Sequence, residues 1–392
     1  ERVVPQTRET AVKHHTALLR TFGIAAALLA AAAPHAADGA RRQGSVPRLH
    51  FPAQQVAAAD SIRIPLRRPR TARLVFAGDL MQHLPQVAAA RRADGTFDYG
   101  RTFEAVAPLF ADADLAAINL ETTLTDSDHH TGYPCFRSPA ALADALRACG
   151  IDVCVLANNH CCDGGAEGIR TTLRTLDRAG IGRTGVFADS CDLRRHHPLR
   201  LRAGEVEVAL LDYTYGTNGI PVPRGALVNR IDTAAMRRDL HRARSEGADV
   251  VAVCIHWGEE YARRENAAQR RTAAWLRRHG ADLVIGSHPH VVQPYRADSA
   301  GAVFYSLGNF VSNQRRRYCD GGIVAVIDVV CRDGQRPLFR AGTVPVWVLL
   351  PGYRVLPGPV ADTLRMSPAA RRAYERFAAD THEILSAATN AE

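Results

Sequence analysis

Short apolar runs recur along the middle of this chain, and helix-like stretches lie between them. Continuous apolar runs of this kind predict strands that are buried on both faces. The seven runs span residues 74–77, 115–120, 151–157, 206–211, 250–255, 283–285 and 303–305. The helix-like stretches span residues 139–149, 166–179, 233–246 and 267–279, with further strands from about residue 323 and a polar terminal helix over 367–387. This alternation predicts an α/β fold in which helices cover buried sheets.

The N-terminal part of the chain predicts a leader followed by a linker. Arg20 precedes a short apolar run, and small residues near Ala36 and Ala37 fit the cleavage site of a secretory signal peptide. Export to the periplasm or cell envelope is therefore expected, and a short Ala-rich helix is the alternative. The expected layout is a leader over 1–37, an Arg-, Pro- and Gln-rich linker over 38–70, the main domain over 71–330, and completing C-terminal strands and helix over 331–392.

Composition excludes several classes of protein. Past the N-terminus the chain has no uncharged apolar stretch of about 18 residues or more, which excludes a polytopic membrane protein. The net charge of +9 comes from arginine, because Lys13 is the only lysine. This charge is compatible with an anionic partner, but no basic run with interleaved aromatic residues indicates nucleic acid. The nine cysteines include no C-x-x-C pair and fit neither a zinc ribbon nor a disulfide framework, although export would allow one or two bridges.

Polar clusters directly follow six of the apolar runs, and ligands gather at the carboxyl ends of strands in such folds. Taken singly, these residues would be turn residues, helix caps or packed histidines; their ordered recurrence at strand ends indicates a metal site. Mixed oxygen and nitrogen ligands suit Zn²⁺, Mn²⁺ or Fe²⁺ better than Ca²⁺, and six ligands are too many for one tetrahedral zinc. They suit two metals about 3.5–4 Å apart that share a carboxylate. The candidate ligands are Asp79, Glu121, Asn159, His256, His288 and His290.

Other histidines lack this context. The pairs at 129–130 and 196–197 follow no apolar run of the series, and both pairs are expected in loops.

The motifs that carry these residues resemble the CapA capsule-synthesis family over about residues 73–327. They read GDLM, NLET, ANNHCCDGG, HWGEEY, GSHPHVVQP and YSLGNF in chain order. The resemblance implies a part in capsule or poly-γ-glutamate formation. The family is similar in turn to the calcineurin-like metallophosphatases, which implies a metallophosphatase-like four-layer β-sandwich flanked by helices.

The resemblance also implies a role for each residue. Asn159 is expected as a metal ligand and His160 as its neighbouring catalytic histidine. Asp79 corresponds to the first carboxylate, Glu121 to the bridging position, His256 to the isolated metal histidine, and His288 and His290 to the closing H-x-H pair.

Two features depart from the metallophosphatase pattern. The D-x-H motif is broken, because Leu80 and Met81 follow Asp79; His83 is an alternative ligand, with a different spacing. Glu121 is longer than the expected Asp. These departures put full two-metal occupancy and ordinary phosphatase activity in question. Arg137, in the loop YPCFR, is expected to grip a substrate carboxylate or phosphate, or else to be a surface arginine.

The leading interpretation is an exported, metal-dependent hydrolase of phosphoesterase-like character, with one or two divalent ions (Mn, Zn or Fe). Its expected partners are an anionic polymer or small anionic substrate and the envelope proteins of capsule synthesis, with no nucleic acid. The alternative is a non-enzymatic accessory protein that binds an anionic polymer during its synthesis or export. A third interpretation is a structural relic that keeps only the fold.

Overall fold

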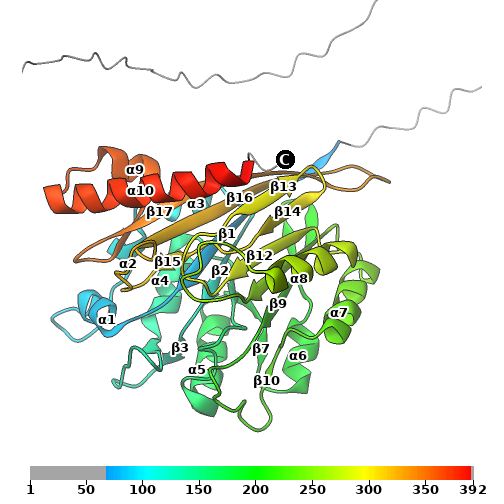
Figure 1. Cartoon of the computed structure of the whole chain (residues 1–392). Helices are drawn as coiled ribbons and strands as arrows, with labels where there is room; N and C mark the ends of the chain where they lie inside the picture. Colours follow the sequence, from blue (N-terminus) through cyan, green and yellow to red (C-terminus); the bar gives the residue numbers. More distant parts are fainter. Residues whose placement is uncertain (1–67, 390–392) are drawn as a thin grey trace, which may run out of the picture. The chain divides into compact units, whose positions relative to one another are not determined.

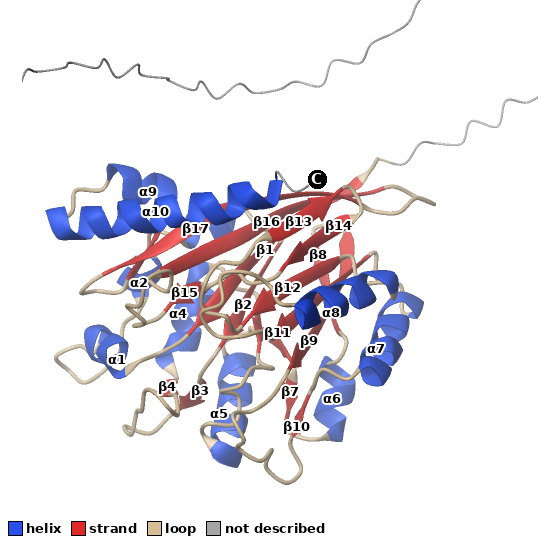
Figure 2. Cartoon of the chain, in the orientation of Figure 1, coloured by secondary structure: helices blue, strands red, loops and turns tan. Residues whose placement is uncertain are grey.

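The computed structural model describes residues 68–389. Two β-sheets pack face to face, and helices cover the outer face of each sheet, as Figure 1 and Figure 2 show. The predicted four-layer α/β sandwich is thus confirmed by the arrangement of this chain's own sheets and helices. Among the described helices, none is long and apolar enough to cross a membrane.

The first sheet is mixed. Its β1, β2, β5 and β6 run parallel, whereas β16, β17 and β18 add antiparallel strands at the other side of β1. The strands are β1 (Arg70–Leu80), β2 (Leu115–Leu120), β5 (Val153–Val155), β6 (Gly182–Thr184), β15 (Asn309–Val311, paired with the end of β1), β16 (Gly321–Cys331), β17 (Leu338–Leu349) and β18 (Arg354–Pro357).

The second sheet has four parallel strands between two antiparallel edge strands. Its order is β13 (Tyr295–Asp298), β14 (Gly301–Phe304), β12 (Leu283–Ser287), β11 (Val250–His256), β9 (Val206–Thr214) and β8 (Leu199–Ala203). Two short pairs lie apart from the sheets: β3 (Thr123–Thr125) with β4 (Arg137–Pro139), and β7 (Val186–Phe187) with β10 (Leu227–Val228).

Alternating side chains of the strands build the layers. In β1, Leu74 and Phe76 pack against the second sheet, whereas Val75 and Ala77 face α4 and α5. The outer face of the second sheet packs against α7 and α8. The helices are α1 (Leu84–Ala90), α2 (Gly100–Phe103), α3 (Ala107–Ala111), α4 (Ala141–Cys149), α5 (Gly165–Arg178), α6 (Ser190–His196), α7 (Thr233–Ser245), α8 (Ala267–Arg278), α9 (Gly358–Thr363) and α10 (Pro368–Thr389).

Each of the seven apolar runs overlaps a strand, and the five expected helices match α4, α5, α7, α8 and α10 within a few residues. Two expectations were wrong. Arg70, placed in the linker, begins β1, where it forms an ion pair with Asp249. His196, expected in a loop, is the last residue of α6; His197 follows in a loop as expected, but it is buried there and its Nε2 lies 3.0 Å from Asp239 Oδ2. The leader and nearly all of the linker lie outside the described residues and stay predictions.

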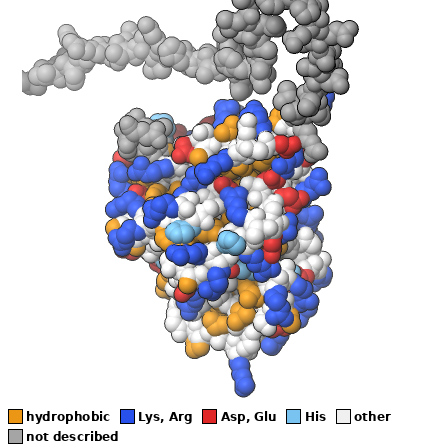
Figure 3. All heavy atoms as spheres, turned by 90° about the vertical axis from the view of Figure 1, so that its right-hand side faces the viewer, with side chains coloured by type: hydrophobic (Ala, Val, Ile, Leu, Met, Phe, Trp, Pro, Cys, Tyr) orange, Lys and Arg blue, Asp and Glu red, His pale blue; other side chains and the backbone are white. Residues whose placement is uncertain are grey.

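Charge is distributed evenly over the surface in view. Figure 3 shows basic side chains spread across one face, with acidic side chains between them rather than a single basic field. This face therefore offers no broad surface of a single charge for an anion.

Candidate metal centre

The six candidate ligands lie together where parallel strands of both sheets end. Asp79 stands near the end of β1 and Glu121 directly after β2 in the first sheet. His256 ends β11 in the second sheet, and His288 and His290 follow β12. All five side chains are buried. The structure thus brings these side chains together at the strand ends, as the sequence predicted.

Asp79 is held by close approach of two backbones. A Cβ atom at Gly78 would lie 2.0 Å from the carbonyl oxygen of Gly308, so only glycine fits beside this loop. The Asp79 amide then donates to the same Gly308 oxygen at 2.9 Å. Its carboxylate turns towards the second sheet, where Oδ2 lies 3.0 Å from His290 Nδ1 and accepts from the His288 amide at 3.3 Å.

Asn119, in β2, connects the two carboxylates. Its Nδ2 donates to Asp79 Oδ1 at 2.8 Å and to Glu121 Oε2 at 3.2 Å. Its own Oδ1 accepts from Asn158 Nδ2 at 3.1 Å, which fixes the orientation of the Asn119 amide. Asn119 therefore sets the spacing of the acidic side chains without having to bind a metal.

The side chains form two groups with metal-ligand geometry, and Glu121 belongs to both. One group combines Glu121 with Asp79 and His256, and the other combines Glu121 with His288 and His290. Within each group the ligand atoms lie within 4.8 Å of one another. Glu121 Oε1 lies 3.6 Å from His256 Nε2 and 3.8 Å from His290 Nε2. These separations are too long for hydrogen bonds and leave room between the atoms.

The protonation states of this cluster favour a cation. Burial lowers the pKa of His288 to about 4 and lowers the pKa of His256 well below its usual range, so both rings are neutral near pH 7. Burial, and then the nearby Asp79, raise the pKa of Glu121 well above its usual range. Among residues 68–389, no arginine forms an ion pair with either carboxylate. The acidic pair is thus without a basic counter-charge, while neutral imidazoles are the form that binds metals.

Two ligand atoms also lack hydrogen bonds. In the described part of the chain, Glu121 Oε1 and His288 Nδ1 are buried and have no hydrogen-bond partner. Buried polar atoms are normally satisfied, so such orphans need an explanation. A bound cation would satisfy both, and the donor set therefore fits the divalent transition metal that the sequence predicted.

The H-P-H segment adopts an unusual backbone. His288 has a φ of +97° and His290 a φ of +58°, in the region that residues with side chains seldom enter. Backbone strain of this kind clusters at functional sites. Here it directs both imidazoles towards the carboxylates.

Asn159 and Tyr215 complete the wall around His256. The Oδ1 of Asn159 lies 2.8 Å from His256 Nε2, so Asn159 contacts the cluster as predicted for a ligand. The Tyr215 ring is stacked with the His256 ring at 6.3 Å and lies 4.6 Å from the His288 ring. Tyr215 is 46% exposed, which places an aromatic surface between the cluster and solvent.

His160 belongs to a separate pair next to the ligands. Its Nδ1 lies 2.7 Å from Asp163 Oδ2, and the same oxygen accepts from the Phe136 amide at 2.6 Å. The edge of the His160 ring contacts Phe136, with 4.7 Å between the ring centroids. His160 is buried, and within the described residues it belongs to neither of the two ligand groups.

Comparison with known proteins decides the family. Residues 73–314 match the family described as bacterial capsule synthesis protein PGA_cap. The chain belongs to the PGA_cap family. It is similar to the PGA biosynthesis protein CapA of Bacillus subtilis (28% identity over 251 residues, covering 61% of this chain and 63% of that protein). It is also similar to the capsule biosynthesis protein CapA of Bacillus anthracis (33% over 175 residues, 43% and 42%).

A third relative is a probable polyglutamine synthesis accessory protein of Mycobacterium tuberculosis, with 29% identity over 219 residues that cover 51% of this chain and 56% of the relative. The chain thus matches less than two thirds of the length of each of these relatives. Among solved structures it resembles a phosphatase from Mycoplasma pneumoniae (TM-score 0.46, 11% identity, 71% of this chain and 95% of that one) and the NAD nucleotidase of Haemophilus influenzae (0.44, 11%, 80% and 63%). Both scores are below 0.5, and the fold assignment rests on the layers described above.

Two more residues of this PGA_cap protein were predicted to take part in the site: Arg137 as a substrate contact and His83 as an alternative ligand. Arg137 begins β4 and reaches the loop after His160, where one guanidinium nitrogen lies 3.5 Å from the Gly164 carbonyl oxygen. Its Nε is buried without a partner in the described structure, which is unlike a fully solvated surface arginine. His83, the alternative ligand, lies outside both ligand groups and caps α1, with its Nδ1 3.2 Å from Gln86 Oε1.

Sequence reasoning missed Asn119 and Tyr215 as parts of the site. Asn119 stands in the quoted NLET motif two residues before Glu121, and alternation in a strand places both side chains on the same side. This two-residue spacing could have indicated that Asn119 lies beside Glu121 in the site. Tyr215 follows β9, a central strand of the second sheet to which no candidate was assigned.

Proposed function

We propose that this PGA_cap protein is a metal-dependent hydrolase with phosphoesterase-like chemistry. The single observation that carries the proposal is the place of Glu121 in two buried ligand groups. A carboxylate shared between two sets of histidine and acidic ligands is the arrangement required for a pair of cations. Asp79 and His256 would hold one ion with Glu121, and His288 and His290 the other. Asn159 would add its amide oxygen on the His256 side.

When bound, such ions supply a nucleophilic water at neutral pH and stabilise charge on the oxygens of the displaced group. Mn²⁺, Zn²⁺ or Fe²⁺ fits this mixed donor set. The chain's own residues supply the other requirements. His160 would donate a proton to the leaving atom, with Asp163 holding its Nδ1 and leaving Nε2 for the substrate. Arg137 would hold an anionic group of the substrate beside it.

The proposed setting is capsule or poly-γ-glutamate synthesis at the cell envelope. Family membership and the names of the relatives support this setting, and the leader expected over residues 1–37 supports export. An anionic polymer or a small anionic substrate fits Arg137 and a site that concentrates positive ions. N-terminal sequencing of the protein recovered from the cell envelope tests export: a chain starting near Ala37 supports it, and an intact leader on a cytosolic protein contradicts it.

A substrate panel tests the activity. The protein is depleted of metal, reloaded separately with Mn²⁺, Zn²⁺ or Fe²⁺, and assayed on phosphomonoesters, phosphodiesters and γ-glutamyl amides. Turnover should require metal and should be lost in Glu121→Gln, while Glu259→Gln, a change at an exposed carboxylate outside the ligand groups, should retain it. A loaded protein that cleaves none of the three classes would contradict the proposal.

A second candidate is an accessory protein that binds an anionic polymer without cleaving it. The observation that favours it is the broken D-x-H motif, because Met81 is a buried core residue and His83 is a helix cap outside both ligand groups. One of the two sets of ligands would then be incomplete for catalysis. Polymer binding by a metal-loaded protein that turns over no ester or amide would favour this candidate.

A further inference from the structure

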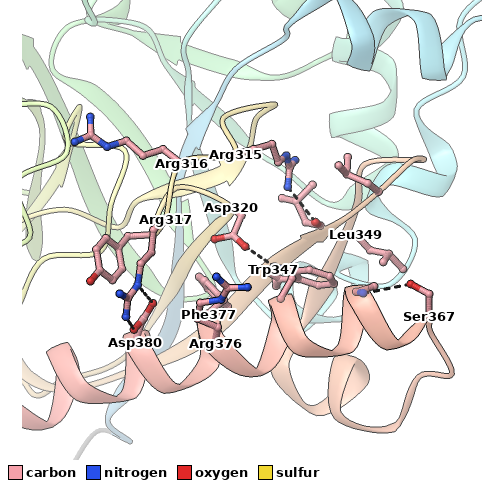
Figure 4. A pocket seen from close by; sticks show the side chains of 15 residues that line it. Arg315, Arg316, Arg317, Asp320, Trp347, Leu349, Ser367, Arg376, Phe377 and Asp380 are labelled. Atoms are coloured by element: carbon pink, nitrogen blue, oxygen red, sulfur yellow. Dashed lines mark hydrogen bonds and ion pairs between the residues drawn. The ribbon is translucent and has the colours of Figure 1, made fainter.

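A pocket of about 410 Å³ lies beyond the last residue that the family match covers. It is formed by the loop that follows β15, the end of β17 and one face of α10. Figure 4 shows its walls, with Trp347 and Phe377 at the base and arginines around them. Its volume suits a small ligand or a short segment of a polymer.

Arginine dominates the charge of the pocket. Its lining contains four arginines (315, 316, 317 and 376) against Asp320 and Asp380, which leaves a net charge of +2. Arg317 is neutralised by Asp380 at 2.8 Å, and Arg315 donates to the carbonyl oxygens of Ser312 and Val348. Asp320 is engaged by the Trp347 indole at 3.0 Å.

Two arginines keep their charge available. Arg376 is exposed on α10 and forms no ion pair with any residue between 68 and 389. Arg316 also lacks an acidic partner there and lies instead over the Tyr261 ring, 4.4 Å from its centroid. Figure 4 shows Arg316 pointing away from α10, whereas Arg317 points down to Asp380. The two free guanidinium groups thus lie on different sides of one pocket.

Arg316 connects the pocket to the candidate metal centre. The Tyr261 ring beneath it lies 6.2 Å from the ring of His290, a candidate ligand. The Tyr261 amide donates to the carbonyl oxygen of Pro289 at 2.8 Å, within the H-P-H segment itself. Arg316, a lining residue of the pocket, is thus separated from a candidate metal ligand by one aromatic ring.

We infer that this pocket, through Arg316 and Arg376, binds the carboxylates of an acidic peptide chain, such as a run of linked glutamates. Guanidinium groups bind carboxylates in a forked geometry, and two of them set apart fit charges that repeat along a chain. The half-buried Leu349 and the exposed Leu350 in the lining suit the methylene groups that separate such carboxylates. The inference rests on the proposed function in one respect only: the reacting bond of the bound acidic peptide would lie at the metal centre.

Binding of a fluorescent, γ-linked glutamate oligomer to the full chain tests the inference. Anisotropy is measured on chelator-treated protein, so that the metal centre contributes no cation. Arg376→Gln and Arg316→Gln should each raise the Kd about tenfold, the effect of losing one charge-assisted contact. The wild-type Kd should also rise when salt is increased from about 0.01 M to about 0.15 M, because screening shortens the Debye length from about 30 Å to about 8 Å.

Arg372→Gln is the matched control, because Arg372 is an exposed arginine of the same helix that does not line the pocket. It should leave the Kd within about twofold of wild type. Equal weakening in all three variants, or wild-type affinity in Arg376→Gln and Arg316→Gln, would overturn the inference. Displacement of the oligomer by inorganic phosphate at equal concentration would also overturn it, since the ligand would not be a carboxylate chain. A protein that binds the oligomer through these arginines but hydrolyses nothing would reject the proposed function and keep the inference.

Discussion

The Nδ1 atom of His160 lies 2.7 Å from the Oδ2 atom of Asp163, three residues along the same buried loop. The Phe136 amide donates to the same carboxylate oxygen, so Asp163 cannot turn away without losing two contacts. The pair thus orients the imidazole and fixes which of its nitrogens remains for a substrate. In the proposed mechanism this makes His160 the proton donor and Asp163 its positioning residue.

Replacing His160 should separate proton transfer from metal binding. His160→Asn is expected to lower kcat about 10²–10⁴-fold, the usual contribution of general acid catalysis, while the metal content stays near that of wild type. Asp163→Asn should lower kcat less and shift the pH profile, because the ring keeps its place but loses its charged partner. Steady-state kinetics and elemental analysis on the same samples test this, with the exposed His129→Asn as control. Full activity in His160→Asn would move weight to the polymer-binding alternative.

Asn119 is expected to matter for both stability and metal affinity. Asn119→Ala removes the donor that both Asp79 and Glu121 share, so the free energy of unfolding should fall by about 1–3 kcal/mol. Metal affinity should fall about 10–100-fold, as for other residues that orient ligands. Asn266→Ala is the comparison variant, because it removes the N-cap of α8 and should cost about 1 kcal/mol of stability. Metal affinity that falls equally in both variants would show that stability alone is being measured.

Asp212 should make the free energy of unfolding depend on pH. It lies in the buried part of β9, accepts from the Leu156 and Ala157 amides, and burial raises its pKa from 3.8 to about 8. A folded-state pKa above the unfolded value means that its stabilising contribution is complete below pH 3.8 and is lost as the pH rises to about 8. Asp212→Asn cannot ionise and should escape this loss. Its free energy of unfolding, relative to wild type in urea titrations, should therefore increase between about pH 5 and about pH 8. A difference that stays constant with pH would contradict the assigned pKa.

The sequence allowed much of the sheet framework to be predicted because parallel strands must be apolar on both faces. The apolar residues 115–120 and 250–255 are stable only when both faces of the strand are buried, and they form the buried strands β2 and β11. The antiparallel strands β16 and β17 were harder to predict. In residues 338–349 only Phe339 and residues 346–348 are buried, with half-buried residues over 341–345, so the segment shows neither a continuous apolar run nor a clear alternation.

The site was predictable in part for a different reason. Asp79, Glu121 and the histidines each follow an apolar run, and strand ends of one sheet edge must converge. What could not be predicted is how the two sheets face each other, which decides that Glu121 reaches His256 and His290 across them. Tyr215 stacks on His256 for another reason: it directly follows β9, which pairs with β11 in the second sheet, and the sequence does not say which strands pair. Pair contacts of this kind leave no periodic signal in a single chain.

The place of Glu121 in both ligand groups is tested most directly by metal stoichiometry. Protein loaded with Mn²⁺ or Zn²⁺ and freed of excess metal is analysed by inductively coupled plasma mass spectrometry, as wild type, Glu121→Gln and His256→Ala. We predict about two ions per chain for wild type, about one for His256→Ala, and a loss of both for Glu121→Gln, since two-metal sites share their bridging carboxylate. A wild-type chain that retains no metal, or a Glu121→Gln chain that retains as much as wild type, would contradict the account.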